Sequence, residues 1–152
     1  MKKFVIGVVM AVCVVILSIG LIACTTTKGP EGNYELESVI VNGTTYNAWD
    51  TIPADKFTGK DYVVRNNDMI VVIGEKGPAT GSFSYQRTFG GGLVTGGGLW
   101  SENDDGEITF SFHTDPNGTF AMEYEGEGEV TFSESLYSSK GEMSITYILK
   151  RT

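Results

Sequence analysis

The chain has 152 residues, and its 19 Asp and Glu residues outnumber its 11 Lys and Arg residues, which gives a formal charge of −8. Such an acidic chain lacks the basic surface with which proteins bind nucleic acid. Its single histidine cannot supply a His-rich zinc or copper site. A hydrophobic content of 41% excludes a disordered chain, and the length suits one domain.

The N-terminus carries an export signal. Lys2 and Lys3 precede an almost unbroken apolar run over residues 4–22, which is typical of a secretory signal peptide. The run closes with Leu21-Ile22-Ala23-Cys24, which resembles the bacterial lipobox. In a lipobox a small residue precedes the cleaved bond, and the Cys that follows accepts diacylglycerol and later a fatty acyl chain such as palmitate. The alternative is an uncleaved anchor helix.

The resemblance predicts three segments. Residues 1–23 are the cleaved signal peptide, residues 24–31 are a flexible tether, and residues 32–152 are the folded domain. We expect Cys24 to hold the exported protein on a membrane of the bacterial cell envelope, with inner and outer membrane both open. Cleavage would also remove Cys13, so we expect the core alone, without a disulfide, to hold the fold.

Apolar and polar residues alternate along most of the mature chain. In residues 107–113, for example, Ile108, Phe110 and Phe112 share one face. This pattern is typical of strands with one face in water, and turns rich in Asn, Asp and Gly separate the segments. We predict an all-β antiparallel up-and-down meander of about eight to nine strands that closes into a barrel. The expected strands cover residues 33–41, 60–66, 68–73, 80–89, 99–103, 107–113, 119–125, 129–133 and 142–150.

Two segments depart from this alternation. Residues 47–59 contain Trp49, Ile52 and Phe57, and we expect a loop or one short helical turn there. Residues 90–98 contain six glycines but lack the Lys of a phosphate-binding loop. For this glycine-rich stretch we expect a mobile loop or a strongly bent hairpin.

The two ends of the domain resemble the calycin group, which includes the lipocalins and the fatty-acid-binding proteins. The first strand begins Gly32-Asn33-Tyr34, and the last ends Leu149-Lys150-Arg151. In that group a Gly-x-Trp opens the first strand, and a basic residue of the last strand packs on the ring. The resemblance implies a lipocalin-like barrel closed by Gly32, Tyr34 and Arg151 (or Lys150), with Tyr in place of Trp.

The alternation of side chains along each strand suggests which of them enter the barrel. Arg87 shares a face with Phe83 and Tyr85, so an inward Arg87 needs an anionic partner. A ligand carboxylate is one candidate, and an internal acid, Asp61 or Asp68, is another. The alternative is that these aromatic residues face outward. The other residues expected inside are Tyr34, Leu36, Ile40, Phe110, Phe112, Phe120, Met122, Tyr124, Phe132, Ile145 and Tyr147.

Two hypotheses of function follow. The first is a non-enzymatic carrier of a small apolar or amphipathic ligand, in which Trp49, Ile52 and Phe57 form a lid over the barrel or a plug in it. The second is a solid-cored β-domain that binds another envelope protein. We expect no enzymatic activity, cofactor or metal, since the chain has no Gly-x-Ser-x-Gly, and its acidic clusters lack EF-hand spacing. The ligand-contacting residues expected under the first hypothesis are Arg87, Tyr85, Phe83, Tyr147, Phe112 and Tyr124.

Overall fold

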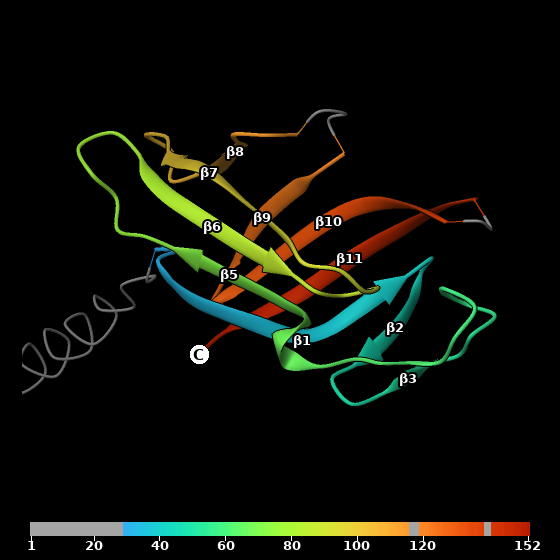
Figure 1. The fold of residues 1–152 in the computed structure, drawn as a ribbon. Coiled ribbons are helices and arrows are strands. Elements are labelled where there is room, and N and C mark those ends of the chain that lie inside the picture. Colours follow the sequence, from blue (N-terminus) through green and yellow to red (C-terminus); the bar gives the residue numbers. More distant parts are fainter. Residues whose placement is uncertain (1–28, 116–118, 139–140) are drawn as a thin grey trace, which may run out of the picture.

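Antiparallel strands make up most of the computed structural model, which describes residues 29–115, 119–138 and 141–152 (Figure 1). The predicted signal peptide and Cys24 lie outside these residues. In the described ranges, no helix has the length and apolarity needed to cross a membrane. The elements are β1 (Gly32–Val41), β2 (Thr44–Asn47), β3 (Thr51–Ile52), β4 (Tyr62–Val63), the 3-10 turn η1 (Asn66–Asp68), β5 (Met69–Ile73), β6 (Gly81–Arg87), β7 (Val94–Glu102), β8 (Ile108–Phe112), β9 (Ala121–Gly126), β10 (Glu129–Ser138) and β11 (Gly141–Arg151).

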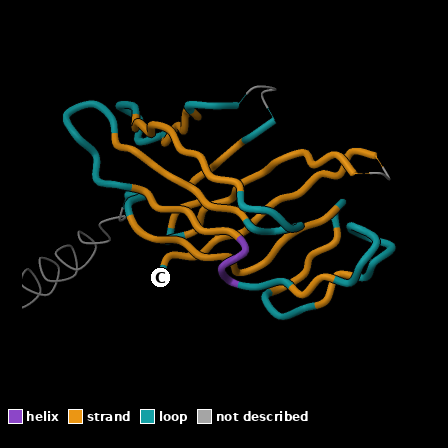
Figure 2. Tube along the Cα trace, in the orientation of Figure 1, coloured by secondary structure: helices purple, strands orange, loops and turns teal. Residues whose placement is uncertain are grey.

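The main sheet curls into a nearly closed barrel. Its hydrogen-bonded order is β8-β7-β6-β5-β1-β11-β10-β9, so the first strand pairs with the last. The other neighbours are consecutive in sequence except β5 and β1, because β2 forms a side branch on β1 and β3 pairs with β4 in a separate sheet. The order breaks between β8 and β9, and we call the space between these two strands the seam. The prediction of an all-β, up-and-down antiparallel barrel is confirmed, and this architecture is compatible with a calycin-like fold. Figure 2 shows strands and connecting loops, with one short helical turn.

The barrel closes where β1 meets β11. Tyr34 lies opposite Arg151 in the ladder, and the Arg151 Cζ lies 5.5 Å from the centre of the Tyr34 ring. Arg151 also donates a hydrogen bond of 2.8 Å to the Tyr34 hydroxyl, which in turn donates to the Pro30 carbonyl at 2.6 Å. A guanidinium on an aromatic face stabilises by about 0.5–2 kcal/mol. The contact expected between the two ends of the domain is therefore present.

A bulge in β1 changes which residues enter the core. The register with β11 shifts between Leu36 and Ser38, and an extra residue in a strand moves the residues after it to the opposite face. Val39 and Val41 are consequently buried, whereas Ile40 is only partly buried. Strict alternation predicted Ile40 as the inward residue, and that prediction is wrong.

The glycine-rich stretch forms a turn followed by half a strand. Gly90, Gly91 and Gly92 adopt positive φ angles in the turn, as a hairpin requires. Gly96 and Gly98 instead lie within β7, opposite Tyr85 and Phe83. A Cβ on Gly98 would lie 2.7 Å from the Phe83 ring and 2.0 Å from the Ser111 carbonyl oxygen. Of the two expectations for this stretch, the hairpin is present, because β6 and β7 pair on either side of the turn. A loop is wrong for residues 94–98, because Gly96 and Gly98 make room for large rings from β6.

Residues 48–65, which we call the plug, cover the barrel end where β1 finishes. Ile52 and Phe57 are fully buried there, and the Phe57 ring lies 4.8 Å from that of Phe89. Trp49 is 70% exposed and contributes nothing to this packing. Two residues of the predicted lid therefore close the barrel as a plug, and the third faces solvent. The expected strand over residues 60–66 is reduced to Tyr62–Val63.

The close approach of β7 to β6 gives a test of the fold. We expect Gly98→Ala to lower the free energy of unfolding by about 1–3 kcal/mol or more, because the added methyl group overpacks the Phe83 site. Thr95→Ala, at an exposed position of the same strand, should change it by less than about 0.5 kcal/mol. Urea denaturation followed by circular dichroism measures both. Equal stability of the two variants would contradict the packing described for β7.

Candidate functional site

Aromatic rings fill the middle of the barrel. Tyr85 packs on Phe132 with ring centres 5.0 Å apart, and Phe112 lies 5.6 Å from Phe132. Phe83 joins this cluster through Phe112 at 5.1 Å. These rings come from β6, β8 and β10, so they connect opposite walls of the barrel. The contacts of Phe112 with Phe132 and Phe83 are edge-to-face, and contacts of this kind add about 0.5–1.5 kcal/mol each to the burial of the rings.

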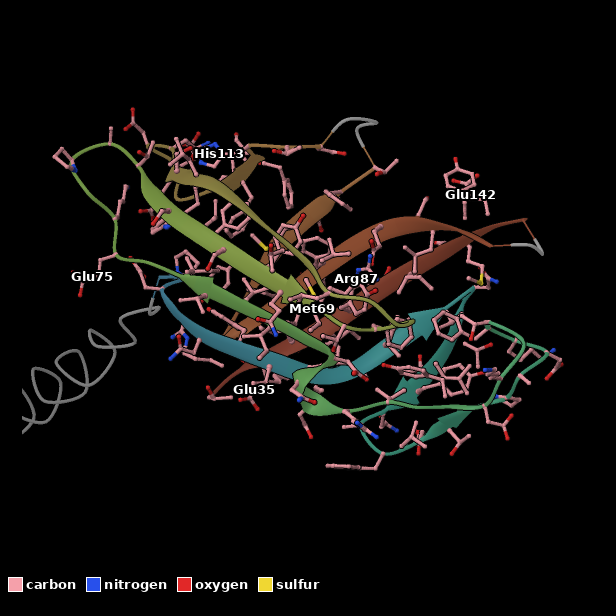
Figure 3. All side chains as sticks on the ribbon, viewed as in Figure 1. Glu35, Met69, Glu75, Arg87, His113 and Glu142 are labelled. Carbon is pink, nitrogen blue, oxygen red and sulfur yellow. The ribbon has the colours of Figure 1, made fainter. Side chains whose placement is uncertain are left out.

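Arg87 lies inside the barrel near its plugged end, and its charge is balanced within the chain. Its Nε lies 2.9 Å from the Glu134 Oε1, and the two side chains are only 12% and 3% exposed. A second guanidinium nitrogen donates to the Phe89 carbonyl at 2.8 Å. Figure 3 shows Arg87 and Met69 in the interior, whereas Glu75, His113 and Glu142 lie at the periphery.

Tyr147 completes this buried polar cluster. Its hydroxyl donates a hydrogen bond of 2.5 Å to the Glu134 Oε1, the same oxygen that faces Arg87. Burial raises the pKa of Tyr147, and the neighbouring Glu134 raises it further. Burial also raises the pKa of Glu134, although the Tyr147 hydrogen bond and the Arg87 charge oppose that shift. We call Arg87, Glu134 and Tyr147 the buried triad.

The plug separates the buried triad from one end of the barrel. The Phe89 ring lies 5.5 Å from that of Tyr147, and on its other side it contacts Phe57 and Tyr62. A small molecule approaching the buried triad from this end would therefore have to displace the aromatic rings first.

Neither acid considered from the sequence is the partner of Arg87. Asp61 is exposed and accepts a hydrogen bond from the Ala54 amide. Asp68 is buried, and it accepts bonds from the Arg65 amide and the Thr88 hydroxyl, which tie η1 to the end of β6. The alternation of β6 identifies Arg87 as inward, but the partner comes from a different strand.

Glu134 was missed because the predicted strand ended at residue 133. In the structure β10 continues to Ser138, and Glu134 shares the inward face with Val130 and Phe132. The available signal was that Glu134 lies two positions after Phe132, because residues two apart in a strand share one face. A buried Glu in a strand that reads as amphipathic is the natural partner for an inward Arg.

The residues expected to bind a ligand separate into two groups. Arg87, Tyr85, Phe83, Tyr147 and Phe112 lie in or next to the packed interior. Tyr124 lies toward the other end of the barrel, where it is half-buried and interacts with Arg151. The expected set therefore does not gather around one point.

The seam is the least covered part of the barrel wall. Phe110 and Phe112 on β8, and Phe120 just before β9, are half-buried and pack against the core. Where the seam meets the end of the barrel that holds Gly29, a groove of about 400 Å³ opens. Its lining includes four glutamates: Glu102, Glu107, Glu123 and Glu125.

The acidic groove is not arranged as a metal site. Within the described ranges, no three His, Cys, Asp or Glu side chains are grouped closely enough to hold a metal ion. Glu102 forms an ion pair of 3.0 Å with Lys76, and the Glu107 carboxylate accepts a hydrogen bond from the side-chain nitrogen of Asn103. The groove therefore offers negative charge beside the side chains of Ile108 and Tyr124.

No protein-family model, curated protein or solved structure matches this chain. The candidate sites are therefore the buried triad and the seam, as the geometry alone defines them.

The buried triad gives a second test. We expect Arg87→Met to lower the free energy of unfolding by about 3 kcal/mol, since it leaves the buried Glu134 carboxylate without its counterion. Glu134→Gln should cost less, because burial already disfavours the ionised form of Glu134 in the folded protein and raises its pKa. In the double variant neither buried charge remains, and the Gln side chain still accepts the hydrogen bond from Tyr147. Its loss of unfolding free energy should therefore be at least about 1 kcal/mol smaller than the sum of the two single losses. Denaturant unfolding at neutral pH measures this coupling. The exposed ion pair of Lys76 and Glu102 is the control, and its coupling energy should be below about 1 kcal/mol. Additive losses at Arg87 and Glu134 would contradict the ion pair between them.

The raised pKa of Glu134 predicts a pH dependence. Above the ordinary value of 4.5 the folded protein retains a proton that the unfolded chain has released. The contribution of Glu134 to stability is therefore fully present below pH 4.5 and declines as the pH rises through the folded-state pKa. Glu134→Gln removes this decline, so we expect the stability of the variant relative to the wild type to increase with pH over that interval. Urea titrations at successive pH values measure the difference, and a difference that falls with pH would contradict the assignment.

Proposed function

We propose that this chain is a lipid-anchored protein of the bacterial cell envelope, and that its calycin-like barrel is a rigid, non-enzymatic module for binding another envelope protein. The lipobox-like quartet that ends at Cys24 supports the anchor. The paired first and last strands and the ring-filled interior support rigidity.

The observation that carries this proposal is the internal neutralisation of Arg87. A carrier of an anionic lipophile needs a cation that the ligand can reach. Here the guanidinium is bound by Glu134 and by the Phe89 carbonyl, behind the rings of the plug. A ligand carboxylate would have to displace a buried carboxylate of the protein itself. The barrel interior is therefore better suited to holding the fold than to exchanging a ligand.

The position of the tether fits an interaction module. Strand β1 begins, and β11 ends, at the same end of the barrel, and Gly29 is bonded there to Arg151. A lipid on Cys24 would hold this end toward the membrane and leave the plug and the barrel wall facing the aqueous envelope. The acidic body would be repelled by an anionic bilayer, so the acyl chains would provide the attachment.

Carriage of a small amphipathic ligand is the second candidate. It is favoured by the half-buried rings at the seam, which give an apolar route through the barrel wall. A ligand that used this route would contact Phe110, Phe112 and Phe120 before it reached the buried triad.

Native mass spectrometry of the full-length protein, extracted from a bacterial host with mild detergent, distinguishes the two candidates. We expect a mass equal to the chain from Cys24 onward plus its lipid, with no further small molecule. Cys24→Ala should lose the lipid mass, because the acceptor thiol is gone. A stoichiometric small molecule retained by the protein would instead support the carrier, and a wild-type mass without lipid would contradict the anchor.

A further inference from the structure

The seam leaves two strand edges without a partner strand. In the part of the chain that the structure describes, β8 pairs only with β7 and β9 only with β10. Figure 1 shows these two strands as the free edges of the curled sheet. A free edge presents unpaired N–H and C=O groups, and these can template an added strand.

The backbone groups that face the seam on β8 can be identified. The His113 amide donates to the Gly97 carbonyl at 2.9 Å, which continues the ladder between β8 and β7. Because hydrogen-bonded and non-hydrogen-bonded pairs alternate in an antiparallel ladder, Thr109 and Ser111 also direct their N–H and C=O toward β7. Those of Phe110 and Phe112 therefore point away from β7, toward the seam.

The side chains around the seam have two characters. Toward the interior, Phe110 and Phe112 are half-buried and form an apolar floor. On the outer side, Glu123 and Glu125 are exposed on β9 and line the groove of about 400 Å³. Glu125 accepts a long bond of 3.4 Å from the Thr131 hydroxyl, and Glu102 is paired with Lys76. The outer rim therefore carries excess negative charge.

We propose that the seam binds an extended polypeptide segment of a partner protein, with alternating apolar and basic side chains, as a strand added to the free edge of β8. The added backbone pairs with the N–H and C=O groups of Phe110 and Phe112. Its apolar side chains cover the half-buried rings, and its Lys or Arg side chains lie on the outer face beside Glu123 and Glu125. The inference rests on the proposed function and specifies the surface and the chemistry of its partner.

The first experiment measures binding of a defined probe to the detergent-solubilised full-length protein. The probe is a fluorescein-labelled octapeptide of alternating Val and Lys, capped at its other end, and fluorescence anisotropy follows its binding at low and high salt. We expect saturable binding that weakens with salt. A peptide of alternating Val and Glu should not bind, and neither should the Val-Lys peptide N-methylated at every residue, which keeps its charge but has no N–H group to donate from either edge.

Amide hydrogen exchange then locates the bound peptide. We expect exchange at Phe110 and Phe112 to slow when the Val-Lys peptide binds, because their N–H groups gain an acceptor. The amides of Thr109 and Ser111 already donate to β7, so their exchange should change little. Slower exchange confined to another edge, such as β2, would overturn the proposal.

Two matched double variants test the role of charge. Glu123→Gln with Glu125→Gln removes two exposed carboxylates beside the seam, and we expect the Val-Lys peptide to bind between about 2-fold and 30-fold more weakly, as for two exposed ion pairs. Glu35→Gln with Glu37→Gln makes the same change in net charge on β1, where both side chains are also exposed. The β1 variant should bind as the wild type does.

Each outcome bears on a defined claim. Absence of binding, equal binding of the N-methylated peptide, or equal loss in both double variants would overturn strand addition at the seam. Self-association of the protein in sedimentation velocity, with Phe110 and Phe112 protected without peptide, would assign the seam to a second copy and also overturn it. None of these results would affect the lipid mass, or the absence of a retained small molecule, expected from mass spectrometry, so the proposed function fails separately.

Discussion

Pairing of the first strand with the last is the constraint on which the rest of this structure depends. Strand β1 bonds β5 on one side and β11 on the other, with Tyr34 and Arg151 joined by a ring contact and a hydrogen bond. Because the two chain ends are used to close the barrel, the break in the sheet falls between β8 and β9 in the middle of the chain. The same closure brings Gly29 to one end of the barrel, away from the plug. Gly29 thus lies at the opposite end from the plug and beside the groove at the end of the seam.

Three polar side chains deep in the interior satisfy one another. A buried Arg and a buried Glu are each costly alone, and together with the Tyr147 hydroxyl they form a set in which each charged group has a partner. The aromatic rings that surround them lower the local dielectric, so the pairing is strong and a missing partner is expensive. This arrangement suits a barrel whose interior is fixed. Recognition would then occur where backbone groups remain free, at the edge of the sheet.

Alternation predicted the fold class and the face that Phe83, Tyr85 and Arg87 share on β6, because these depend on local patterns. The contact at the barrel closure was implied by the resemblance of the two chain ends to the calycin group. Alternation failed where tertiary packing overrides a local pattern. The bulge at Leu36–Ser38 moves Val39 inward, and Gly96–Gly98 form a strand because Tyr85 and Phe83 occupy the space that side chains would fill. The partner of Arg87 could not be found from spacing alone, since Glu134 is 47 positions further along the chain and meets it only across the curled sheet. The seam was likewise unpredictable, because β8 and β9 read as ordinary alternating strands.

The acidic rim also explains how a free strand edge can persist on this protein. Exposed edges invite pairing between copies of the same chain, and like charges beside an edge oppose that pairing. Two seams brought together would place Glu123 and Glu125 of one copy near those of the other, in a groove that already contains Glu107. A basic segment would instead be attracted to the same edge, because each of its Lys or Arg side chains reduces the repulsion among the glutamates. The charge that keeps the edge free of its own copies would therefore also select its partner.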